Sequence, residues 1–399
     1  MKTVYASILV FLMAAGHASA ATVQVFSSPD NSFSVLSGFL SEANSSVYLA
    51  SYTFDSLEVA DLLSAAADRG VEVIVMVEGG PAGGISGQES AVLCGLTGKG
   101  ITIRSYKGPA PYMHAKYIVR DNSSLLISTE NFGPAGFSYN PGYGNRGWGA
   151  VTDWGAAEFL RTYFSDIALT VVFPCPANST PLYDRHAAGR AGLAESASFS
   201  GQQVSTFFSP DGSMDAILGL IASAGRSVYI EQLYARRLWK DGKESPLLAA
   251  VIERARKGLE VKILLDSTYY NVNPENKDNN NATVEYINGI AAAEGLDMEA
   301  RLANLAGNGL KLVHVKGVVV DGSAVIISSV NWNYNSALRN REAGLVIHGN
   351  AAKYYEALFL RDWGGKSGPE AEDEFPALMA LGFFLCLMVV AAFLAVLLR

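Results

Sequence analysis

Hydrophobic and polar positions along the chain follow one pattern in the first half and repeat it in the second. An amphipathic helix is predicted at residues 33–43, and an apolar strand at residues 47–52 follows it. A second helix is predicted at residues 59–69, where Gly70 is the expected glycine after the last turn, and a strand rich in Val and Ile comes next. Apolar strands that alternate with helices indicate a mixed or parallel sheet covered by helices.

The same succession returns at residues 214–224, 228–233 and 247–257, and the last of these segments ends at Gly258. Short sequences recur in the same order, because SSVYLASYTF in the first half corresponds to RSVYIEQLYA in the second, and DRGVEVIVMV corresponds to RKGLEVKILLD. A repeat of about half the chain is too long for a solenoid. It indicates the duplication of a whole domain.

The segments that fall outside this repeat are predicted to be loops. Residues 176–203 are rich in Ala, Ser and Gly and lack periodicity, which predicts a linker between the halves. The second half also carries a polar, basic insert at residues 236–245. A further insert at residues 269–283 contains NPENKDNNNAT, and we expect it to be an exposed loop.

Both ends of the chain have the composition of targeting segments. Residues 1–20 combine a positive head, a short apolar core and the small residues Ala18-Ser19-Ala20, which is the form of a secretory signal peptide. Residues 376–398 carry no charge and are long enough to cross a bilayer as a helix. Acidic residues precede this run and Arg399 follows it, so the positive end is expected in the cytoplasm. We therefore expect an exported protein held at the cell membrane by a C-terminal transmembrane helix; a tail processed after export is the alternative.

Composition and charge narrow the chemistry. Hydrophobic residues make up 49% of the chain and charged residues 17%, which is enough apolar material for a large core. The formal net charge of −8 gives no global field that attracts nucleic acid, so any phosphate site must be local. Of the three cysteines, Cys386 lies in the C-terminal apolar run, so Cys94 and Cys175 are the pair that an exported chain can bridge.

Two matching stretches carry the candidate chemistry. MHAKYIVRD begins at residue 113, and VHVKGVVVD begins at residue 313. Alternate side chains of a strand share one face, so His114 is expected to point with Lys116, and His314 with Lys316. The aspartates at the ends of the two stretches begin turns and are expected to anchor backbone N–H groups behind the site; they are Asp121 and Asp321.

The strands that follow, predicted at residues 125–128 and 324–328, end in hydroxyl and amide side chains: Thr129 and Asn131 in one half, Ser329 and Asn331 in the other. A lysine supplies a cation, and hydroxyl and amide groups supply hydrogen-bond donors to phosphoryl oxygens. A histidine can attack phosphorus or move protons near neutral pH. Two histidines at one phosphate can divide these tasks, with one forming a phosphohistidine and the other protonating the leaving oxygen. The lysines stabilise the developing charge, so this chemistry needs no metal and no cofactor.

The residues resemble the phospholipase D superfamily, whose pattern is H-x-K-x4-D followed after six residues by G-S-x-N. Two copies at matching places in a duplicated domain make a specific signal. Ser128 and Ser328 replace the glycine of the pattern, and Thr129 replaces its first serine. The resemblance covers residues 22–365 and implies an α/β fold of two duplicated α/β/α sandwich lobes, related by a pseudo-twofold axis, with one active site at their interface.

The resemblance also implies an acid that orients a histidine. The second half has Glu342 at that place, in Asn340-Arg341-Glu342, whereas the first half has Gly147. A carboxylate fixes the tautomer of an imidazole and raises its basicity, which favours His314 as the better-supported ring. The two-lobed enzymes of the family instead assign the nucleophile to the first half, which favours His114, so the two roles stay open. Glu130 and Asp153 are candidates to orient His114.

Together these features predict a metal-independent phosphodiesterase of phospholipase D type that acts as a monomer with both lobes forming one site. Phospholipid is the expected substrate, because the membrane tether would hold the site near headgroups. A nuclease of the same family is the enzymatic alternative, and a non-catalytic phosphate- or lipid-binding module is another. The expected organisation is a signal peptide (1–20), a first lobe (21–175), a linker (176–203), a second lobe (204–365), an acidic segment (366–375) and a transmembrane helix (376–398).

Overall fold

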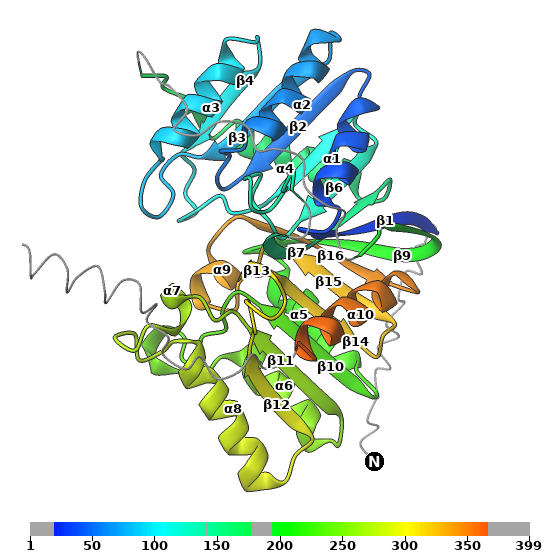
Figure 1. Ribbon diagram of the computed structural model, residues 1–399, viewed down its shortest axis with the longest axis vertical. Helices are drawn as coiled ribbons and strands as arrows, with labels where there is room; N and C mark the ends of the chain where they lie inside the picture. Colours follow the sequence, from blue (N-terminus) through cyan, green and yellow to red (C-terminus); the bar gives the residue numbers. More distant parts are fainter. Residues whose placement is uncertain (1–19, 141–142, 177–193, 366–399) are drawn as a thin grey trace, which may run out of the picture.

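A computed structural model describes residues 20–140, 143–176 and 194–365 of the chain (Figure 1). The predicted transmembrane helix, the acidic segment before it, all of the signal peptide except Ala20, and most of the linker lie outside these residues. Within the described residues, no helix is both long and apolar enough to span a bilayer.

The first half of the chain alternates strands and helices in the predicted order. Its β2 (Ser46–Ser51), α2 (Leu57–Asp68) and β6 (Ser124–Ser128) lie within one or two residues of the predicted bounds. Gly70 follows α2 with φ +89°, the left-handed conformation that a glycine adopts most readily after a helix. The remaining elements are β1 (Ala21–Ser28), α1 (Ser32–Ser41), β3 (Glu72–Glu78), α3 (Gly87–Thr97), β4 (Thr102–Tyr106), β5 (Tyr117–Arg120), β7 (Gly144–Thr152), α4 (Ala156–Ile167) and β8 (Thr170–Val172).

The second half repeats this order with additions. Its β9 (Ala197–Ser209) begins inside the segment predicted to be a linker, because residues 197–203 pair with neighbouring strands. The elements that follow are α5 (Ser213–Ser223), β10 (Ser227–Gln232), η1 (Lys240–Gly242), α6 (Pro246–Arg256), β11 (Glu260–Leu265), α7 (Tyr269–Val272), α8 (Asn280–Glu294), β12 (Met298–Leu302), β13 (Leu310–Val313), β14 (Lys316–Val320), β15 (Ala324–Ser328), α9 (Tyr334–Leu338), β16 (Glu342–His348) and α10 (Ala351–Trp363).

The insert at residues 269–283 is not the exposed loop that its composition predicted. It contains α7 and the start of α8, with an exposed turn between them. Buried amide side chains hold it against the fold, since Asn271 donates to Asp266 and Asn280 donates to the backbone oxygens of Leu233 and Asp266. Asn271 and Asn280 are therefore internal hydrogen-bonding groups, whereas residues 275–277 are exposed as predicted, and composition alone does not distinguish the two kinds.

One mixed sheet runs through both halves. The strand order is β12-β11-β10-β14-β15-β16-β9-β1-β7-β6-β5-β2-β3-β4-β8, with β13 paired separately to β7. The order of β1-β7-β6-β5-β2-β3-β4 matches that of β9-β16-β15-β14-β10-β11-β12, so the predicted duplication is visible in the topology. Strands β1 and β9 pair antiparallel where the two halves meet (Figure 1).

Helices cover both faces of each half-sheet. Apolar residues of α1, α2 and α3 pack on one face of the first half, and those of α5, α6 and α8 on one face of the second. A third apolar cluster contains residues of α4 and α10 together with strand residues of both halves, including Trp148, Val313 and Val315. The chain is thus a mixed α/β protein in which α4 and α10 belong to the core shared by the two lobes.

Cys94 and Cys175 form a disulfide, with Cα atoms 5.5 Å apart. The bond joins α3 to the segment that follows β8, so it closes the outer edge of the first lobe. The sequence identified this pair as the available one, and the structure confirms the bridge.

Candidate active site

The two histidines lie just before strands of their own lobes, not within them as the alternation pattern predicted. Strand β5 begins at Tyr117 and β14 at Lys316, so His114 and His314 precede regular pairing. Each preceding segment instead crosses to the other lobe. Met113 forms a bridge with Arg341, and β13 runs parallel to β7 with Val313 opposite Arg146.

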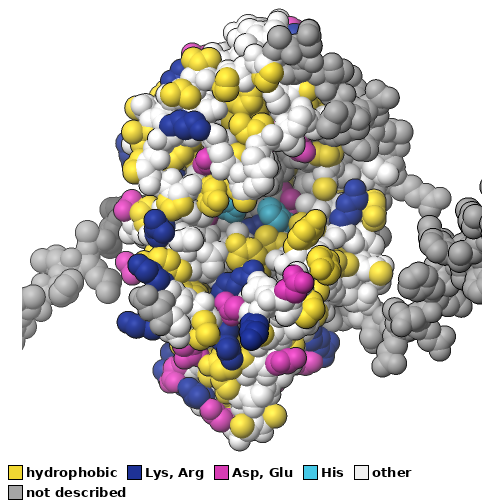
Figure 2. Space-filling view, turned by 90° about the vertical axis from the view of Figure 1, so that its left-hand side faces the viewer, with side chains coloured by type: hydrophobic (Ala, Val, Ile, Leu, Met, Phe, Trp, Pro, Cys, Tyr) yellow, Lys and Arg dark blue, Asp and Glu magenta, His cyan; other side chains and the backbone are white. Residues whose placement is uncertain are grey.

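This crossing fixes the backbone of both histidines. The His114 N–H donates to the carbonyl oxygen of Arg341 at 2.7 Å, and the His314 N–H donates to that of Arg146 at 2.8 Å. Each histidine therefore belongs to one lobe by sequence and is held by a strand of the other lobe. Figure 2 shows histidine side chains in a hollow between the two lobes, with Lys or Arg side chains beside them.

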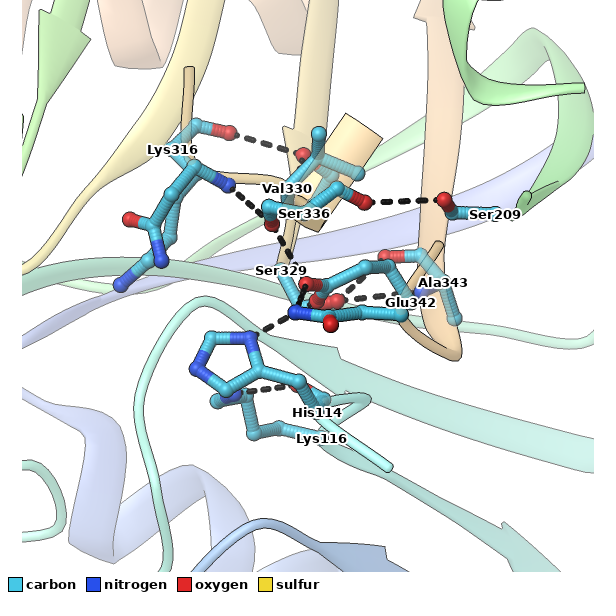
Figure 3. A network of polar contacts seen from close by, with 12 residues as sticks. His114, Lys116, Ser209, Lys316, Ser329, Val330, Ser336, Glu342 and Ala343 are labelled. Carbon is cyan, nitrogen blue, oxygen red and sulfur yellow. Dashed lines mark hydrogen bonds and ion pairs between the residues drawn. The ribbon is translucent and has the colours of Figure 1, made fainter. Parts of the chain in front are cut away.

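The carboxylates that face the histidines also come from the opposite lobes. Glu342 Oε2 lies 2.8 Å from His114 Nδ1, and the two side chains point toward one another in Figure 3. Glu130 Oε2 lies 3.3 Å from His314 Nδ1. Both assignments made from sequence are therefore wrong: Glu342 does not support His314, and Glu130 does not support His114. Sequence proximity suggested pairing within a lobe, whereas the strand crossing exchanges the partners.

The second oxygen of Glu342 is held as well. Glu342 Oε1 accepts hydrogen bonds from the hydroxyl of Ser336 and from Asn340 Nδ2, the latter at 3.1 Å (Figure 3). Burial raises the pKa of Glu342, but its interactions with His114 and Lys116 outweigh this effect and leave the pKa below its ordinary value. Glu342 is therefore ionised at neutral pH, so His114 Nδ1 must carry the proton and donate it. The Nε2 atom of His114 then carries a free lone pair.

Burial sets the charge of the other groups. It lowers the pKa of His114 to about 4, and Glu342 offsets this lowering only in part. Burial, reinforced by Lys316, lowers the pKa of His314 as well. Both rings are neutral in the empty site at pH 7, and their side chains are 12% and 11% exposed, which leaves them within reach of a ligand.

The two lysines are buried side by side. Lys116 is 1% exposed and Lys316 is fully buried. Burial lowers the pKa of Lys116 to about 7, and burial together with the charge of Lys116 lowers the pKa of Lys316 well below its ordinary value. Lys116 Nζ donates to the carbonyl oxygen of His114, and Lys316 Nζ donates to that of His314 at 2.7 Å. Two buried amines whose charge is disfavoured, each bonded to a neutral oxygen, form a site whose protonated state an anion would stabilise.

The predicted phosphate-binding hydroxyls bond to the backbone instead. Thr129 Oγ1 accepts from the N–H of Trp148, and Ser329 Oγ accepts from the N–H of Ala343, both at 3.0 Å. These bonds fasten each loop after β6 or β15 to the adjacent strand. The amide oxygens of Asn131 and Asn331 are buried and have no hydrogen-bond partner among the described residues. These oxygens can accept only from a donor, so the predicted contact with phosphate would have to be made by the amide nitrogens.

Asp121 and Asp321 anchor turns, as the sequence predicted. Asp121 accepts from the N–H groups of Asn44, Ser45 and Ser46, and Asp321 accepts from those of residues 225–227. Both adopt left-handed backbone conformations, with φ of 51° and 55°. Burial raises the pKa of Asp121, but the three N–H donors outweigh it and bring the pKa to about 2. The aspartates therefore fix the start of β2 and β10 at the far end of the motif strands.

Two further acids were missed by the sequence analysis. Glu78 Oε2 accepts from the N–H of Met113 at 2.7 Å, and Asp266 Oδ1 accepts from the N–H of Val313 at 2.8 Å. Each therefore holds the residue directly before a histidine. The sequence contains a sign of these two acids, because an acid ends or follows the third strand of each half. The apolar periodicity that reveals the repeat carries no information about them.

The aromatic ring of Tyr52 also belongs to the site. Its centroid lies 4.7 Å from that of the His114 imidazole in an edge-to-face arrangement, and Lys116 Nζ lies 5.5 Å from the same ring. The described residues contain no group of three or more His, Cys, Asp or Glu side chains that could hold a metal ion. The site therefore consists of two neutral imidazoles, two buried amines and two carboxylates from both lobes.

The comparison with known families decides what this arrangement is. The family described as "Cardiolipin synthase, PLD-like domain" matches residues 36–143 and 217–363, which include both histidine motifs. The chain belongs to the phospholipase D superfamily. The resemblance read from the two H-x-K-x4-D motifs is thereby confirmed, and membership supports the phosphodiester-transfer chemistry of the superfamily.

Two solved structures share the fold at low identity. Phosphatidylserine synthase of Haemophilus influenzae Rd KW20 is 12% identical, with a TM-score of 0.60 over 86% of this chain and 85% of its own. Polyphosphate kinase of Porphyromonas gingivalis is 14% identical, with a TM-score of 0.52 over 91% of this chain and 55% of its own. Nuc of Salmonella typhimurium, a phospholipase D family member, is 22% identical over 38% of this chain and 98% of its own, with a TM-score of 0.34. No curated protein matches the chain.

Proposed function

We propose that this protein is a phospholipase D-type phosphodiesterase or transphosphatidylase that cleaves a phosphodiester through a covalent phosphohistidine. The observation that carries the proposal is the convergence of two His/Lys pairs, each imidazole facing a buried carboxylate of the other lobe. Two buried lysines, whose pKa values Glu130 and Glu342 restore only in part, suit an anionic phosphate group that would stabilise their charge. The site is complete within one chain, so we propose a monomer whose two duplicated lobes act together.

His114 is the proposed nucleophile. Its Nδ1–H is held by ionised Glu342 at 2.8 Å, so the Nε2 lone pair is free to attack phosphorus. The Nε2–P bond forms as the bond from phosphorus to the leaving oxygen breaks, and His314 gives that oxygen a proton. His314 then accepts a proton from water or an alcohol, whose oxygen attacks phosphorus and releases His114. The negative charge of the bound phosphate raises the pKa of His314 and of both lysines. His314 therefore takes up a proton from solvent when the substrate binds, and this proton goes to the leaving oxygen while the amines stay charged.

Phospholipid is the proposed substrate class. The apolar run at residues 376–398 would hold the site beside a membrane, and the acidic net charge of −8 does not favour a polyanion. Tyr269 and Tyr270 on α7 are 67% and 86% exposed, and α7 begins three residues after Asp266, which holds the segment before His314. Tyrosine is enriched at membrane–water interfaces, so these rings support an orientation with the site toward lipid. We propose accordingly that the catalytic lobes are exported and anchored at the cell membrane.

The test uses the full-length chain in detergent micelles, in the presence of a metal chelator. Labelled phosphatidylcholine, phosphatidylglycerol and single-stranded DNA are offered separately, with His114→Ala and His314→Ala as controls. We expect lipid cleavage that each substitution reduces by about 10³-fold or more. Cleavage of DNA alone would identify a nuclease, and lipid binding without cleavage would identify a binding module.

The order of steps has its own measurement. After denaturation without acid, the His314→Ala protein is expected to retain label from the phosphoryl group of the substrate. His114 can still attack in this variant, while the later steps are slowed. His114→Ala is expected to retain none. Label on the His114→Ala variant and not on the other would reverse the two roles.

A further inference from the structure

We infer that Glu130 replaces the acid that is missing at position 147 and is the positioning residue for His314. This inference rests on the proposed function and deepens it, because it explains how a family member lacking one acid retains two supported histidines. The first lobe has Gly147 where the second has Glu342, and Glu130 stands where the second lobe has Val330. The carboxylate has thus moved from one strand to the neighbouring loop.

The backbone roles show that positions 147 and 342 correspond. The carbonyl oxygens of Arg146 and Arg341 accept from the histidine N–H groups of the opposite lobes. One residue beyond each acid position, the N–H groups of Trp148 and Ala343 donate to Thr129 and Ser329. The two segments are therefore equivalent on both sides of the position where the side chains differ.

The side chain of Glu130 occupies the space that Gly147 leaves. A Cβ atom added at Gly147 would lie 2.4 Å from Glu130 Cγ and 2.8 Å from Oε1. Gly136 bounds the same space from another side, since its Cβ would lie 2.7 Å from Glu130 Oε2. Gly147 does not have the positive φ that would require glycine, so contact with Glu130, not backbone conformation, explains the absence of a side chain there.

Each carboxylate accepts a hydrogen bond from an asparagine at a matching position, although Glu130 Oε1 and His314 Nδ1 have no hydrogen-bond partner among the described residues. Asn145 Nδ2 donates to Glu130 Oε2 at 3.1 Å, and Asn340 Nδ2 donates to Glu342 Oε1 at the same distance. These asparagines occupy matching places two residues before positions 147 and 342. Asn145 therefore holds the relocated acid of the first lobe as Asn340 holds the acid of the second. Glu130 is 1% exposed, and its Oε2 faces His314 Nδ1 at 3.3 Å.

The chemical consequence concerns the proton-transfer step. A carboxylate at Nδ1 fixes the tautomer of His314 and stabilises the imidazolium that must form before the leaving oxygen is protonated. Glu130 supplies this support without contacting the substrate. Its removal should therefore slow turnover and shift the titration of His314 while leaving substrate binding nearly unchanged.

The test transplants the acid back. Glu130→Val introduces the residue found at position 330, Gly147→Glu restores the family position, and the double variant combines them. We expect Glu130→Val to lower kcat about 10–100-fold with little change in KM. Gly147→Glu alone should be impaired by the clash with Glu130, whereas the double variant should recover at least about 10-fold over Glu130→Val. A folded double variant no faster than Glu130→Val would overturn the inference.

A measurement independent of turnover separates this inference from the proposed function. Imidazole NMR of full-length protein in micelles follows the titration of His314 in the wild type and in Glu130→Gln, with Glu342→Gln as the matched variant for His114. We expect Glu130→Gln to lower the pKa of His314 and to leave that of His114 nearly unchanged. Glu342→Gln should lower the pKa of His114 and leave that of His314 nearly unchanged. An unchanged His314 titration would refute the role of Glu130, even in an active enzyme. A shifted titration in a protein that cleaves no substrate would instead support the role of Glu130 and refute the proposed activity.

Discussion

At the scale of single residues, burial decides which charges the site carries. Lys116 and His114 lie together beside Glu342, and burial lowers the pKa of both bases while their mutual contacts with the carboxylate compensate only in part. The empty site therefore holds a neutral nucleophile next to amines that lose their protons easily. A phosphate that enters the site stabilises the protonated amines. Substrate binding is thereby linked to the protonation state that the chemistry needs.

The first prediction concerns the pH dependence of kcat/KM, which reports the free enzyme. His114 must be neutral to attack, so activity should rise as pH increases through its pKa of about 4. His314 must carry a proton and Lys116 must be charged, so activity should fall as pH increases through the lowered pKa of His314 and through the pKa of Lys116 of about 7. A stopped assay over pH 4–10 at constant ionic strength measures the profile. Activity that stays constant from pH 7 to pH 10 would contradict the assignment of the upper limb to His314 and Lys116.

Stability should move in the opposite direction over the upper part of that range. The folded-state pKa of Lys116 lies below its unfolded value of 10.5, so between about 7 and 10.5 the unfolded chain binds more protons and stability increases with pH. Lys116→Met removes this cost of burying an amine. We expect it to abolish turnover and to raise Tm by about 2 °C at pH 7. Lys311→Met, which changes an exposed lysine three residues before His314, is the control, and a Tm for Lys116→Met well below that of the control would contradict this account.

At the scale of elements, local signals placed the strands and turns, and side chains at strand ends connect them. Asp121 and Asp321 hold the starts of β2 and β10, and Glu78 and Asp266 hold the segments before the histidines. Each acid accepts backbone N–H groups that would otherwise be unpaired where the strands end. The loops that carry the chemistry are thereby fixed by the ends of regular elements.

The disulfide gives a prediction at this scale. It closes a loop of 81 residues between α3 and the segment after β8, which restricts the unfolded chain. Replacing both Cys94 and Cys175 with serine should lower the free energy of unfolding by about 2–4 kcal/mol, measured by denaturant unfolding. Cys386→Ser serves as the control and should leave the midpoint unchanged. Because the bridge lies at the outer edge of the first lobe, kcat at 25 °C should be retained, and its loss would show that the bridge also shapes the site.

At the scale of the whole molecule, the lobes exchange structural partners. The shared sheet passes through β1 and β9, and each lobe supplies the strand that receives the histidine segment of the other. Two ion pairs also cross between the lobes: buried Arg146 binds Asp362 of α10, and half-buried Arg341 binds Asp166 of α4. The site therefore exists only when both lobes are docked.

This arrangement predicts that the site is intramolecular. If each chain forms its own site, mixing His114→Ala with His314→Ala protein after joint refolding should restore no activity, because neither chain contains both histidines. Wild type refolded with either variant controls for recovery and should give activity proportional to the wild-type fraction. Recovery of about a quarter of wild-type activity from the mixed variants would instead indicate lobes exchanged between two chains.

The duplicated α/β elements, the residues of both motifs, the turn-forming aspartates and the cysteine pair could be predicted from the sequence. These features depend on local periodicity, on backbone conformations such as those of Gly70 and Asp321, and on the order of the repeat. The tertiary structure alone decided that Glu342 faces His114, that Glu130 faces His314 and that Thr129 and Ser329 bond to the backbone. The two carboxylate–histidine contacts join segments more than 180 residues apart that cross between lobes, and neither the period of a strand nor the spacing of a motif carries information about such a crossing. The two hydroxyl bonds lie within one lobe, but they depend on how the loop after a strand packs on its neighbour, which the motif does not specify.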